Sequence, residues 1–349
     1  MHPQPHFPFG SRYLGALLLG LLLLPCALRA EEAPFKSNPR LSGKAGYRVL
    51  DISYASSKGE TRERKLYLWY PTTDEPHDFH YPIQVGVVAS EGKVSPGRHP
   101  LILFSHGYMG SADQSLFITE ALARAGYIVI STNHADSLGG GHPFQQALPK
   151  FGAPRTWSDQ NFLDRKEDME ALLAHVLKLN STPDSFLYDR IQKDAIGAMG
   201  HSLGGYTILG LAGAWPSWKD ERIRAALAYS PYAAPYNAKM APGSLAIPVM
   251  LQGGTLDFAI TPSLPATYAK LAAPKYYLVL KKATHFEWTN FASVKETTVE
   301  AVEKPGNPPL IVDYTLAFFD HFLLHRDAPL LSQPNEALES YRFNEKKEQ

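Results

Sequence analysis

Residues 195–205 read AIGAMGHSLGG, and this stretch decides the fold. A short apolar run at 195–199 is followed directly by GHSLG at 200–204, which matches the pattern G-x-S-x-G. Between a strand and a helix, this pattern forms a sharp turn that lifts a serine side chain above the end of the strand. Glycines on either side leave room for the neighbouring strand and helix. The stretch therefore predicts a nucleophile elbow with Ser202 at its apex.

Apolar runs of the same kind recur along the chain, and helical patterns separate them. Continuous apolar runs are typical of strands that are buried on both faces of a parallel sheet. Three- and four-residue apolar steps predict helices near 162–177 and 312–323, and Gly126 is expected to end another helix. This alternation predicts an α/β fold with a mostly parallel central sheet and helices on both faces. We expect its strands at Pro100–Phe104, Tyr127–Ser131, Ala195–Met199, Ala225–Tyr229, Ile247–Leu251 and Tyr276–Leu280, after partly exposed antiparallel strands at Tyr47–Tyr54 and Lys65–Tyr70.

Two further side chains follow apolar runs in the order that a serine nucleophile requires. Asp257 comes after the run at 247–251, and His285 comes after the run at 276–280. The chain order Ser–acid–His is that of the α/β-hydrolase arrangement. Ligands bind at the carboxyl ends of strands in such sheets, so we expect Ser202, Asp257 and His285 to converge there. His285 would then take the serine proton, and Asp257 would orient and stabilise the imidazole.

The loop after the run at 100–104 is expected to supply an oxyanion hole. It reads SHGYMG at 105–110, and this fold places a backbone N–H donor at that position. We predict that the backbone N–H groups of Tyr108 and Leu203 hold the developing negative charge. Gly107 would let the backbone approach the substrate closely.

The substrate pocket is predicted from side chains that adjoin these loops. The segments 137–157 and 231–246 are long and rich in Gly, Ala and Pro, and long loops inside a compact domain tend to be functional. We expect these segments to form loop-rich cap insertions that determine the substrate. The pocket itself is predicted to be lined by Met109, Trp157, Phe258 and Phe286.

Other histidines lie near the same loops and offer an alternative base. His106 and His201 are interpreted as residues that pack inside their own turns. His134 with Asp136 is an alternative His–acid pair, but it precedes Ser202 in the chain, against the expected order.

Composition argues against several classes of protein. The 349 residues include 34 basic and 34 acidic side chains, and this neutral balance lacks the basic footprint of a nucleic-acid binder. Cys26 is the single cysteine, so a disulfide within the chain and cysteine-ligated zinc are both excluded. The acidic segment around His77 and His80 is better interpreted as a solvated turn than as a metal site. We therefore expect neither a metal nor an organic cofactor.

The N-terminus has the pattern of a secretory signal peptide. Arg12 precedes an apolar run at 13–24, and small residues suited to cleavage follow. We predict a cleaved signal peptide at 1–30, a polar N-terminal arm at 31–46 and a single α/β-hydrolase catalytic domain at 47–349.

Two other interpretations of the N-terminus are less favoured. The apolar stretch at 13–28 is shorter than the roughly 20 residues that a membrane-spanning helix needs. Pro25 stands where a lipidation motif has a small residue, which disfavours anchoring through Cys26. The protein is therefore expected to be secreted or periplasmic, without a stable membrane span after cleavage. No feature of the sequence specifies an oligomeric state.

Four segments together resemble the α/β-hydrolases of the platelet-activating factor acetylhydrolase and dienelactone hydrolase-like group, and the likeness extends over about 47–325. In the acetylhydrolase branch the nucleophile is a serine, as Ser202 is here, whereas dienelactone hydrolases have a cysteine. The resemblance implies calcium-independent hydrolysis of esters with short or oxidised acyl chains. Secreted polyester hydrolases and cutinases are similar over the same motifs. The four segments are PLILFSHGYMGSADQSLFITEALARAGYIVISTNHADS, AIGAMGHSLGGYT, QGGTLD and ATHFEW.

We therefore expect a serine carboxylic-ester hydrolase that acts through an acyl-enzyme on a small-molecule or lipid ester. The resemblance favours short-acyl, acetylhydrolase-like substrates. An amidase or peptidase, or a cutinase-like polyester hydrolase, would use the same three side chains. A non-catalytic binding protein on an esterase scaffold is less favoured because such proteins generally lack one of the three.

Overall fold

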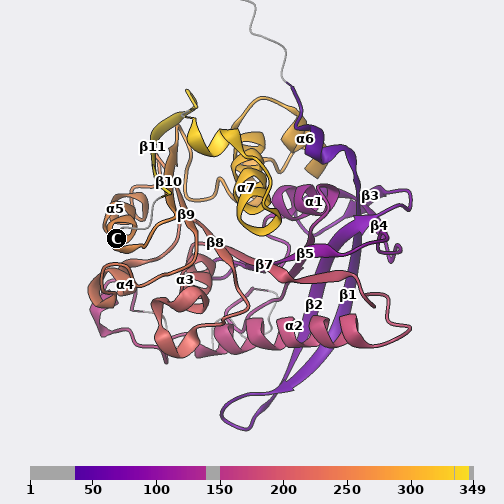
Figure 1. The fold of residues 1–349 in the computed structure, drawn as a ribbon, viewed down its shortest axis with the longest axis horizontal. Helices are drawn as coiled ribbons and strands as arrows, with labels where there is room; N and C mark the ends of the chain where they lie inside the picture. The colour runs from indigo at the N-terminus through magenta and orange to yellow at the C-terminus, as the bar shows by residue number, and fades with distance from the viewer. Residues whose placement is uncertain (1–35, 139–149, 334, 346–349) are drawn as a thin grey trace, which may run out of the picture. The chain divides into compact units, whose positions relative to one another are not determined.

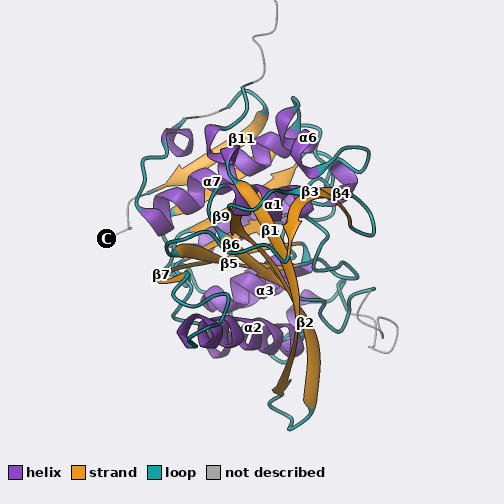
Figure 2. Cartoon of the chain, turned by 90° about the vertical axis from the view of Figure 1, so that its right-hand side faces the viewer, coloured by secondary structure: helices purple, strands orange, loops and turns teal. Residues whose placement is uncertain are grey.

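The structure is a computed structural model that describes residues 36–138, 150–333 and 335–345. Within these ranges the chain forms one mixed sheet of eleven strands, with helices packed on both faces (Figures 1 and 2). The predicted α/β fold class is therefore confirmed. The predicted signal peptide at 1–30 lies outside the described residues, as does most of the loop predicted at 137–157.

Neighbouring parallel strands form the centre of the sheet. The predicted apolar runs all fall within or overlap these strands, and strand β8 has the predicted bounds. The expectation of a mostly parallel central sheet is confirmed. In spatial order the strands are β6 (Ile128–Ser131), β5 (His99–Ser105), β7 (Ile191–His201), β8 (Ala225–Tyr229), β9 (Val249–Gly254) and β10 (Lys275–Leu280).

Further strands extend the sheet at both sides. On the β6 side, β2 is antiparallel to β6 and forms a long hairpin with β1. Strand β4 is parallel to β1 and antiparallel to β3, and at the other edge β11 is antiparallel to β10. Residues 77–80, which the sequence analysis interprets as a solvated turn, instead form strand β3. Their polar side chains are mostly exposed, so this edge strand lacks the apolar signal of a buried one. The bounds are β1 (Lys44–Ala55), β2 (Thr61–Thr72), β3 (His77–His80), β4 (Val85–Ser90) and β11 (Leu338–Asn344).

Part of the predicted N-terminal arm at 31–46 is docked on the domain. Residues Pro39–Ser42 form a short 3₁₀ helix in which Leu41 is buried. Arg40 Nε lies 2.9 Å from Asp320 Oδ2. Strand β1 then begins at residue 44 because its backbone pairs with β2 from that position onward. Arg40 also donates to the carbonyl of Ala125 at 2.8 Å, and Asn38 donates to Asp313 at 2.7 Å. Buried Leu41 and these polar contacts therefore hold a segment whose composition is that of a tether.

Helices cover the two faces of the sheet in separate layers (Figure 2). One layer contains α1 (Leu116–Arg124), α6 (Thr298–Glu303) and α7 (Asn307–Leu324). Gly126 follows α1 with a φ of +100°, so it ends that helix as predicted. The other layer contains α2 (Leu163–Ser181), α3 (Leu203–Leu209), α4 (Ala234–Lys239) and α5 (Leu264–Lys270).

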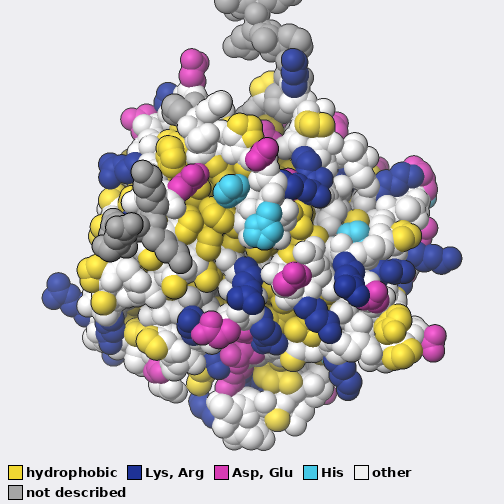
Figure 3. Space-filling model, viewed as in Figure 1, with side chains coloured by type: hydrophobic (Ala, Val, Ile, Leu, Met, Phe, Trp, Pro, Cys, Tyr) yellow, Lys and Arg dark blue, Asp and Glu magenta, His cyan; other side chains and the backbone are white. Residues whose placement is uncertain are grey.

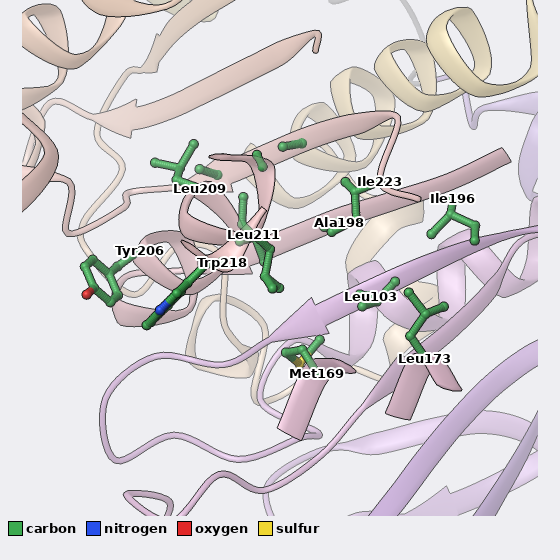
Figure 4. Close-up of a cluster of buried hydrophobic side chains, with 14 of the residues drawn as sticks. Leu103, Met169, Leu173, Ile196, Ala198, Tyr206, Leu209, Leu211, Trp218 and Ile223 are labelled. Carbon is green, nitrogen blue, oxygen red and sulfur yellow. The ribbon is translucent and has the colours of Figure 1, made fainter. Parts of the chain in front are cut away.

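Successive residues of the central strands point to opposite layers. In β5, Leu101 and Leu103 pack toward α2 and α3, whereas Ile102 and Phe104 pack toward α1 and α7. All four are buried, which explains why the sequence of this strand is continuously apolar. Figure 4 shows the α2 and α3 side of this core, where strand and helix side chains meet, among them Leu103, Met169, Leu173, Ala198, Tyr206 and Leu209.

The surface mixes both signs of charge on the face shown in Figure 3, where basic and acidic side chains are interspersed. No helix in the described ranges combines the length and the apolar character that crossing a membrane requires.

Glu120 is a buried acid in the layer of α1. Its carboxylate accepts hydrogen bonds from the backbone N–H of Val87, at 3.1 Å, and from the hydroxyl of Thr298. Burial raises the pKa of Glu120 to about 7, although both hydrogen bonds act to lower it. The folded protein therefore holds a proton that the unfolded chain releases near pH 4.5.

Replacing Glu120 by glutamine should change how stability depends on pH. Because the unfolded chain loses this proton first, the free energy of unfolding falls as pH rises from about 4.5 to 7, by roughly 3 kcal/mol. Glu120→Gln keeps an acceptor oxygen but has no charge to bury. Thermal unfolding should show a melting temperature several degrees higher than wild type at pH 8, and a smaller difference at pH 5. The exposed Glu339→Gln is the control, and equal shifts at both pH values would contradict the assignment.

Candidate active site

Ser202 lies at a sharp turn between β7 and α3. Its backbone has φ 55° and ψ −116°, a conformation that residues other than glycine rarely adopt. The backbone N–H of Ser202 donates to the carbonyl of Tyr229 at 2.9 Å, and the N–H of Tyr232 donates to the carbonyl of Ser202 at 2.9 Å. Contacts with the end of β8 thus hold the serine in its strained conformation, as a functional turn requires.

Glycine at 204 permits α3 to pass close to the sheet. A Cβ atom on Gly204 would collide with the backbone carbonyl of Ser105, at the end of β5. Gly107, in the loop after β5, is less crowded, since a Cβ there would lie 3.1 Å from Nδ1 of His201 and 3.4 Å from the Cβ of Ser202. These close approaches bring the loop after β5 beside the serine.

Three side chains from separate loops form one hydrogen-bonded chain. Nε2 of His285, which lies in the loop after β10, is 3.0 Å from Oγ of Ser202. Its Nδ1 is 2.7 Å from Oδ2 of Asp257, in the loop after β9. Asp257 is buried, whereas the side chain of His285 is 26% exposed. With Asp257 ionised, Nδ1 is the donor and Nε2 is left to accept the serine proton.

The pKa of Asp257 is lowered by its hydrogen bonds. Burial by itself would raise that pKa, but hydrogen bonds from His285 and Ser230 outweigh the effect of burial. The backbone N–H of Ile260, 3.2 Å from Oδ1 of Asp257, lowers the pKa further. Ser230 Oγ donates to Asp257 and lies 3.2 Å from Nδ1 of His285. Ser230 is a site residue that the sequence analysis missed. It follows the apolar run of β8 directly, which is the same signal that points to Asp257 and His285.

His201 and Gln114 link three loops of the site. Gln114 accepts a hydrogen bond from the N–H of Gly107 at 3.0 Å and donates to Nδ1 of His201 at 3.1 Å. Nε2 of His201 can then donate to the carbonyl of His285, 2.8 Å away. Burial and the neighbouring His285 lower the pKa of His201 to about 3, so this ring is neutral. The residue before Ser202 therefore helps to place His285, which contacts Ser202.

The two predicted oxyanion donors lie in segments that border Ser202. Leu203 is the first residue of α3, where a backbone N–H has no acceptor within its own helix. Tyr108 follows Gly107 and, with Ser202, lines the same cleft.

Ser202 and His285 open into a cleft of about 1030 Å³. Met109 and Phe286, from the predicted pocket, are among its lining residues, and Tyr232 belongs to the segment 231–246 that is expected to determine the substrate. Most of the lining is aromatic or aliphatic: Tyr67, Pro82, Ile83, Tyr108, Met109, Leu138, Phe151, Tyr232, Ala259, Ile260, Phe286 and Phe291.

Two residues predicted for the pocket do not line it. Trp157 is buried behind the wall of the cleft, with its ring centroid 5.8 Å from that of Phe151 and 5.1 Å from that of Tyr232. Its Nε1 donates to the carbonyl of Lys150 at 3.1 Å, so it anchors the wall instead of facing a ligand. Phe258 follows the buried Asp257 in a turn and is 78% exposed, outside the cleft.

The alternative pair of His134 and Asp136 does not form. His134 contacts Asp168 at 2.8 Å and Ser105 Oγ at 2.9 Å, and all three side chains are buried. Asp136 instead pairs with Arg165 at 2.7 Å. None of these five residues lines the cleft. In the part of the chain that the structure describes, no cluster of three or more His, Cys, Asp or Glu residues is suited to hold a metal ion.

Comparisons with known proteins find one family model and one solved structure that are similar to this chain. The family model described as PET hydrolase-like matches residues 155–302, a segment that contains Ser202, Asp257 and His285. Among solved structures, the ferulic acid esterase from Streptomyces cinnamoneus is similar, with a TM-score of 0.62 and 21% sequence identity. That similarity covers 89% of this chain and 98% of the other. It confirms the fold that the sequence predicts.

Adding a methyl group at Gly204 should disrupt the elbow. Gly204→Ala would force apart α3 and the backbone of Ser105, and such overpacking costs about 1–3 kcal/mol or more. Denaturant unfolding should show this loss, together with reduced ester turnover. Gly152→Ala is the matched control because nothing lies within 4 Å of the Cβ it would gain. Equal stabilities of the two variants would contradict the close packing at position 204.

Proposed function

Because this chain is an α/β-hydrolase of the serine esterase type, we propose that it hydrolyses carboxylic esters through an acyl-enzyme formed on Ser202. The observation that carries the proposal is the hydrogen-bonded chain from Ser202 through His285 to Asp257, which opens into an apolar cleft. A serine hydroxyl is a poor nucleophile unless an adjacent base takes its proton. The distances of 3.0 and 2.7 Å are those that such a relay requires.

In the first half of the reaction, Ser202 Oγ attacks the ester carbonyl while His285 Nε2 takes its proton. The backbone N–H groups of Leu203 and Tyr108 hold the oxyanion that forms, and Asp257 stabilises the imidazolium. The intermediate collapses as the C–O bond to the alcohol breaks, and His285 gives its proton to the departing alcohol. The products of this half are a free alcohol and an acyl-serine.

In the second half, a water molecule takes the place of the alcohol. His285 removes its proton as the water oxygen attacks the acyl carbonyl, and a second oxyanion forms in the same site. Collapse breaks the bond to Ser202, which regains the proton from His285. The carboxylic acid leaves and the free enzyme is restored.

The lining of the cleft supports an ester that carries an aromatic or extended apolar group. Six aromatic rings line a volume of about 1030 Å³, more than an acetyl group alone would fill. The matching family model is described as PET hydrolase-like and the similar solved structure as a ferulic acid esterase, and both names refer to esters of aromatic acids. The preference for short acyl chains stays a prediction from the sequence resemblance.

An insoluble polyester is a second candidate substrate. Four apolar side chains of the cleft lining are strongly exposed, at 43% for Ile83, 60% for Leu138, 54% for Phe286 and 62% for Phe291. Exposed apolar groups around a cleft favour contact with an apolar surface. Release of soluble acid from a polyester film, compared with turnover of a soluble ester, would distinguish this candidate from a purely soluble substrate.

Removing the hydroxyl of Ser202 should abolish turnover. Ser202→Ala is expected to lower kcat on p-nitrophenyl esters by about 10⁴-fold or more while the protein stays folded. A fluorophosphonate probe should label the wild-type protein but not this variant. Ser244 is exposed, and Ser244→Ala is the control, which should retain both ester turnover and labelling by the probe. Retention of most turnover in Ser202→Ala would reject the mechanism, and a wild-type protein that resists the probe would favour a non-catalytic role.

The substrate class can be read from matched esters. We expect kcat/KM to be higher for the methyl ester of an aromatic acid than for a methyl alkanoate of similar length. A p-nitrophenyl series from two to sixteen carbons tests the short-acyl prediction, and a matched anilide tests the amidase alternative. Phe151→Ala, which removes one ring of the aromatic wall, should lower kcat/KM for the methyl ester of the aromatic acid more than for the methyl alkanoate. An equal effect on both would contradict the role of the aromatic lining.

A further inference from the structure

Arg165 is a fully buried arginine of α2 that reaches the loop after β5. Its guanidinium forms a bidentate pair with Asp136, at 2.9 Å from Nε and 2.7 Å from Nη2. Its remaining donors contact the loop: Nη1 lies 2.7 Å from the carbonyl of His106 and 3.3 Å from Ser105 Oγ, and Nη2 lies 3.1 Å from the carbonyl of Gly107. A buried charge is costly unless it is paired and hydrogen-bonded, and Arg165 satisfies both conditions.

Asp136 is suited to hold this cation in place. Burial would raise the pKa of Asp136, but the adjacent Arg165 outweighs burial and holds that pKa well below its usual range. The pair is therefore charged on both sides at neutral pH. One edge of the guanidinium is fixed by the carboxylate, and the other is presented to the backbone of the loop.

The carbonyl of Gly107 is fixed by several donors. Besides Arg165, it accepts hydrogen bonds from Nδ1 of His106 at 2.6 Å and from the N–H of Gly110 at 3.0 Å. A trans peptide is planar, so the N–H of the next residue points away from this carbonyl. Since the Gly107 carbonyl faces the buried guanidinium, the N–H of Tyr108 faces the opposite side, which is the side of the cleft that Tyr108 lines.

Neutral histidines complete the support of the loop. The N–H of His134 donates to Nε2 of His106 at 3.0 Å, which leaves Nδ1 of His106 to donate to the Gly107 carbonyl. Burial lowers the pKa of both histidines well below the usual range. The positive charge that faces the loop carbonyls is therefore that of Arg165.

We propose that Arg165 is a positioning residue for the oxyanion hole. By binding the carbonyls of His106 and Gly107 from inside, it keeps them away from the cleft and directs the N–H of Tyr108 toward the oxyanion. The inference rests on the proposed function, in which that N–H stabilises the tetrahedral intermediate. Donors fixed before the reaction need no reorganisation during it, and losing one typically lowers kcat by about 10²–10³-fold.

The test compares variants that differ in what the loop carbonyls contact. Arg165→Gln with Asp136→Asn removes both buried charges together, so no unpaired carboxylate is left to unfold the protein. This double variant should lower kcat on a p-nitrophenyl ester by about 10²-fold with little change in KM. Its affinity for a boronic acid, which forms a tetrahedral adduct on Ser202, should fall in parallel. Arg165→Lys retains a positive charge beside Asp136 but lacks the several donors of the guanidinium. Its kcat should lie between those of the double variant and the wild type.

The control removes an ion pair that does not touch the loop. Arg62 Nη1 lies 2.6 Å from Glu167 Oε2, so Arg62→Gln should lower the melting temperature without lowering kcat. A folded double variant, or a folded Arg165→Lys, with wild-type kcat and boronic acid affinity would overturn the proposal. A rise in KM with unchanged kcat would overturn it as well. Failure of the proposed function would look different, because Ser202→Ala would then retain turnover.

Discussion

The strained backbone at Ser202 is the constraint on which the rest of the site depends. A non-glycine residue holds this conformation because its N–H is bound by the last residue of β8 and its carbonyl by Tyr232, and because α3 crosses the end of β5 without a side chain between them. That crossing also brings the loop after β5 beside the serine. The candidate nucleophile and the candidate oxyanion donors are thus held by one set of backbone contacts, and these contacts offset the conformational cost at Ser202.

Hydrogen bonds between side chains and backbone of different loops fix the geometry of the site. Gln114 and His201 connect the loop after β5, the turn at Ser202 and the backbone of His285, while Ser230 donates a hydrogen bond to Asp257. Except for the bond between Gln114 and Gly107, these links join residues that are far apart in the chain. His285 and Asp257 are each held by more than one hydrogen bond, as electrostatic preorganisation requires.

The sequence predicts this fold well where burial leaves a pattern and poorly where it does not. The central strands are buried on both faces, so their sequences are continuous apolar runs that can be recognised. Ser202, Asp257 and His285 each follow such a run. Strands β3 and β11 lie at edges of the sheet and lack that signal. Adjacency to the loops predicts Trp157 and Phe258 in the pocket, but adjacency in sequence does not fix the direction of a side chain. The roles of Arg165 and Gln114 depend on contacts between distant segments, which spacing along one chain does not reveal.

Beneath the loop, Ser105, His134 and Asp168 repeat the order hydroxyl–imidazole–carboxylate at 2.9 and 2.8 Å. All three are sealed from solvent, and Arg165 donates to the same hydroxyl. A search that matches only a three-residue template would therefore retrieve two constellations in this molecule. The two differ in solvent access. Ser202 and His285 line a cleft that can admit an ester and release its alcohol, whereas Ser105, His134 and Asp168 do not line it.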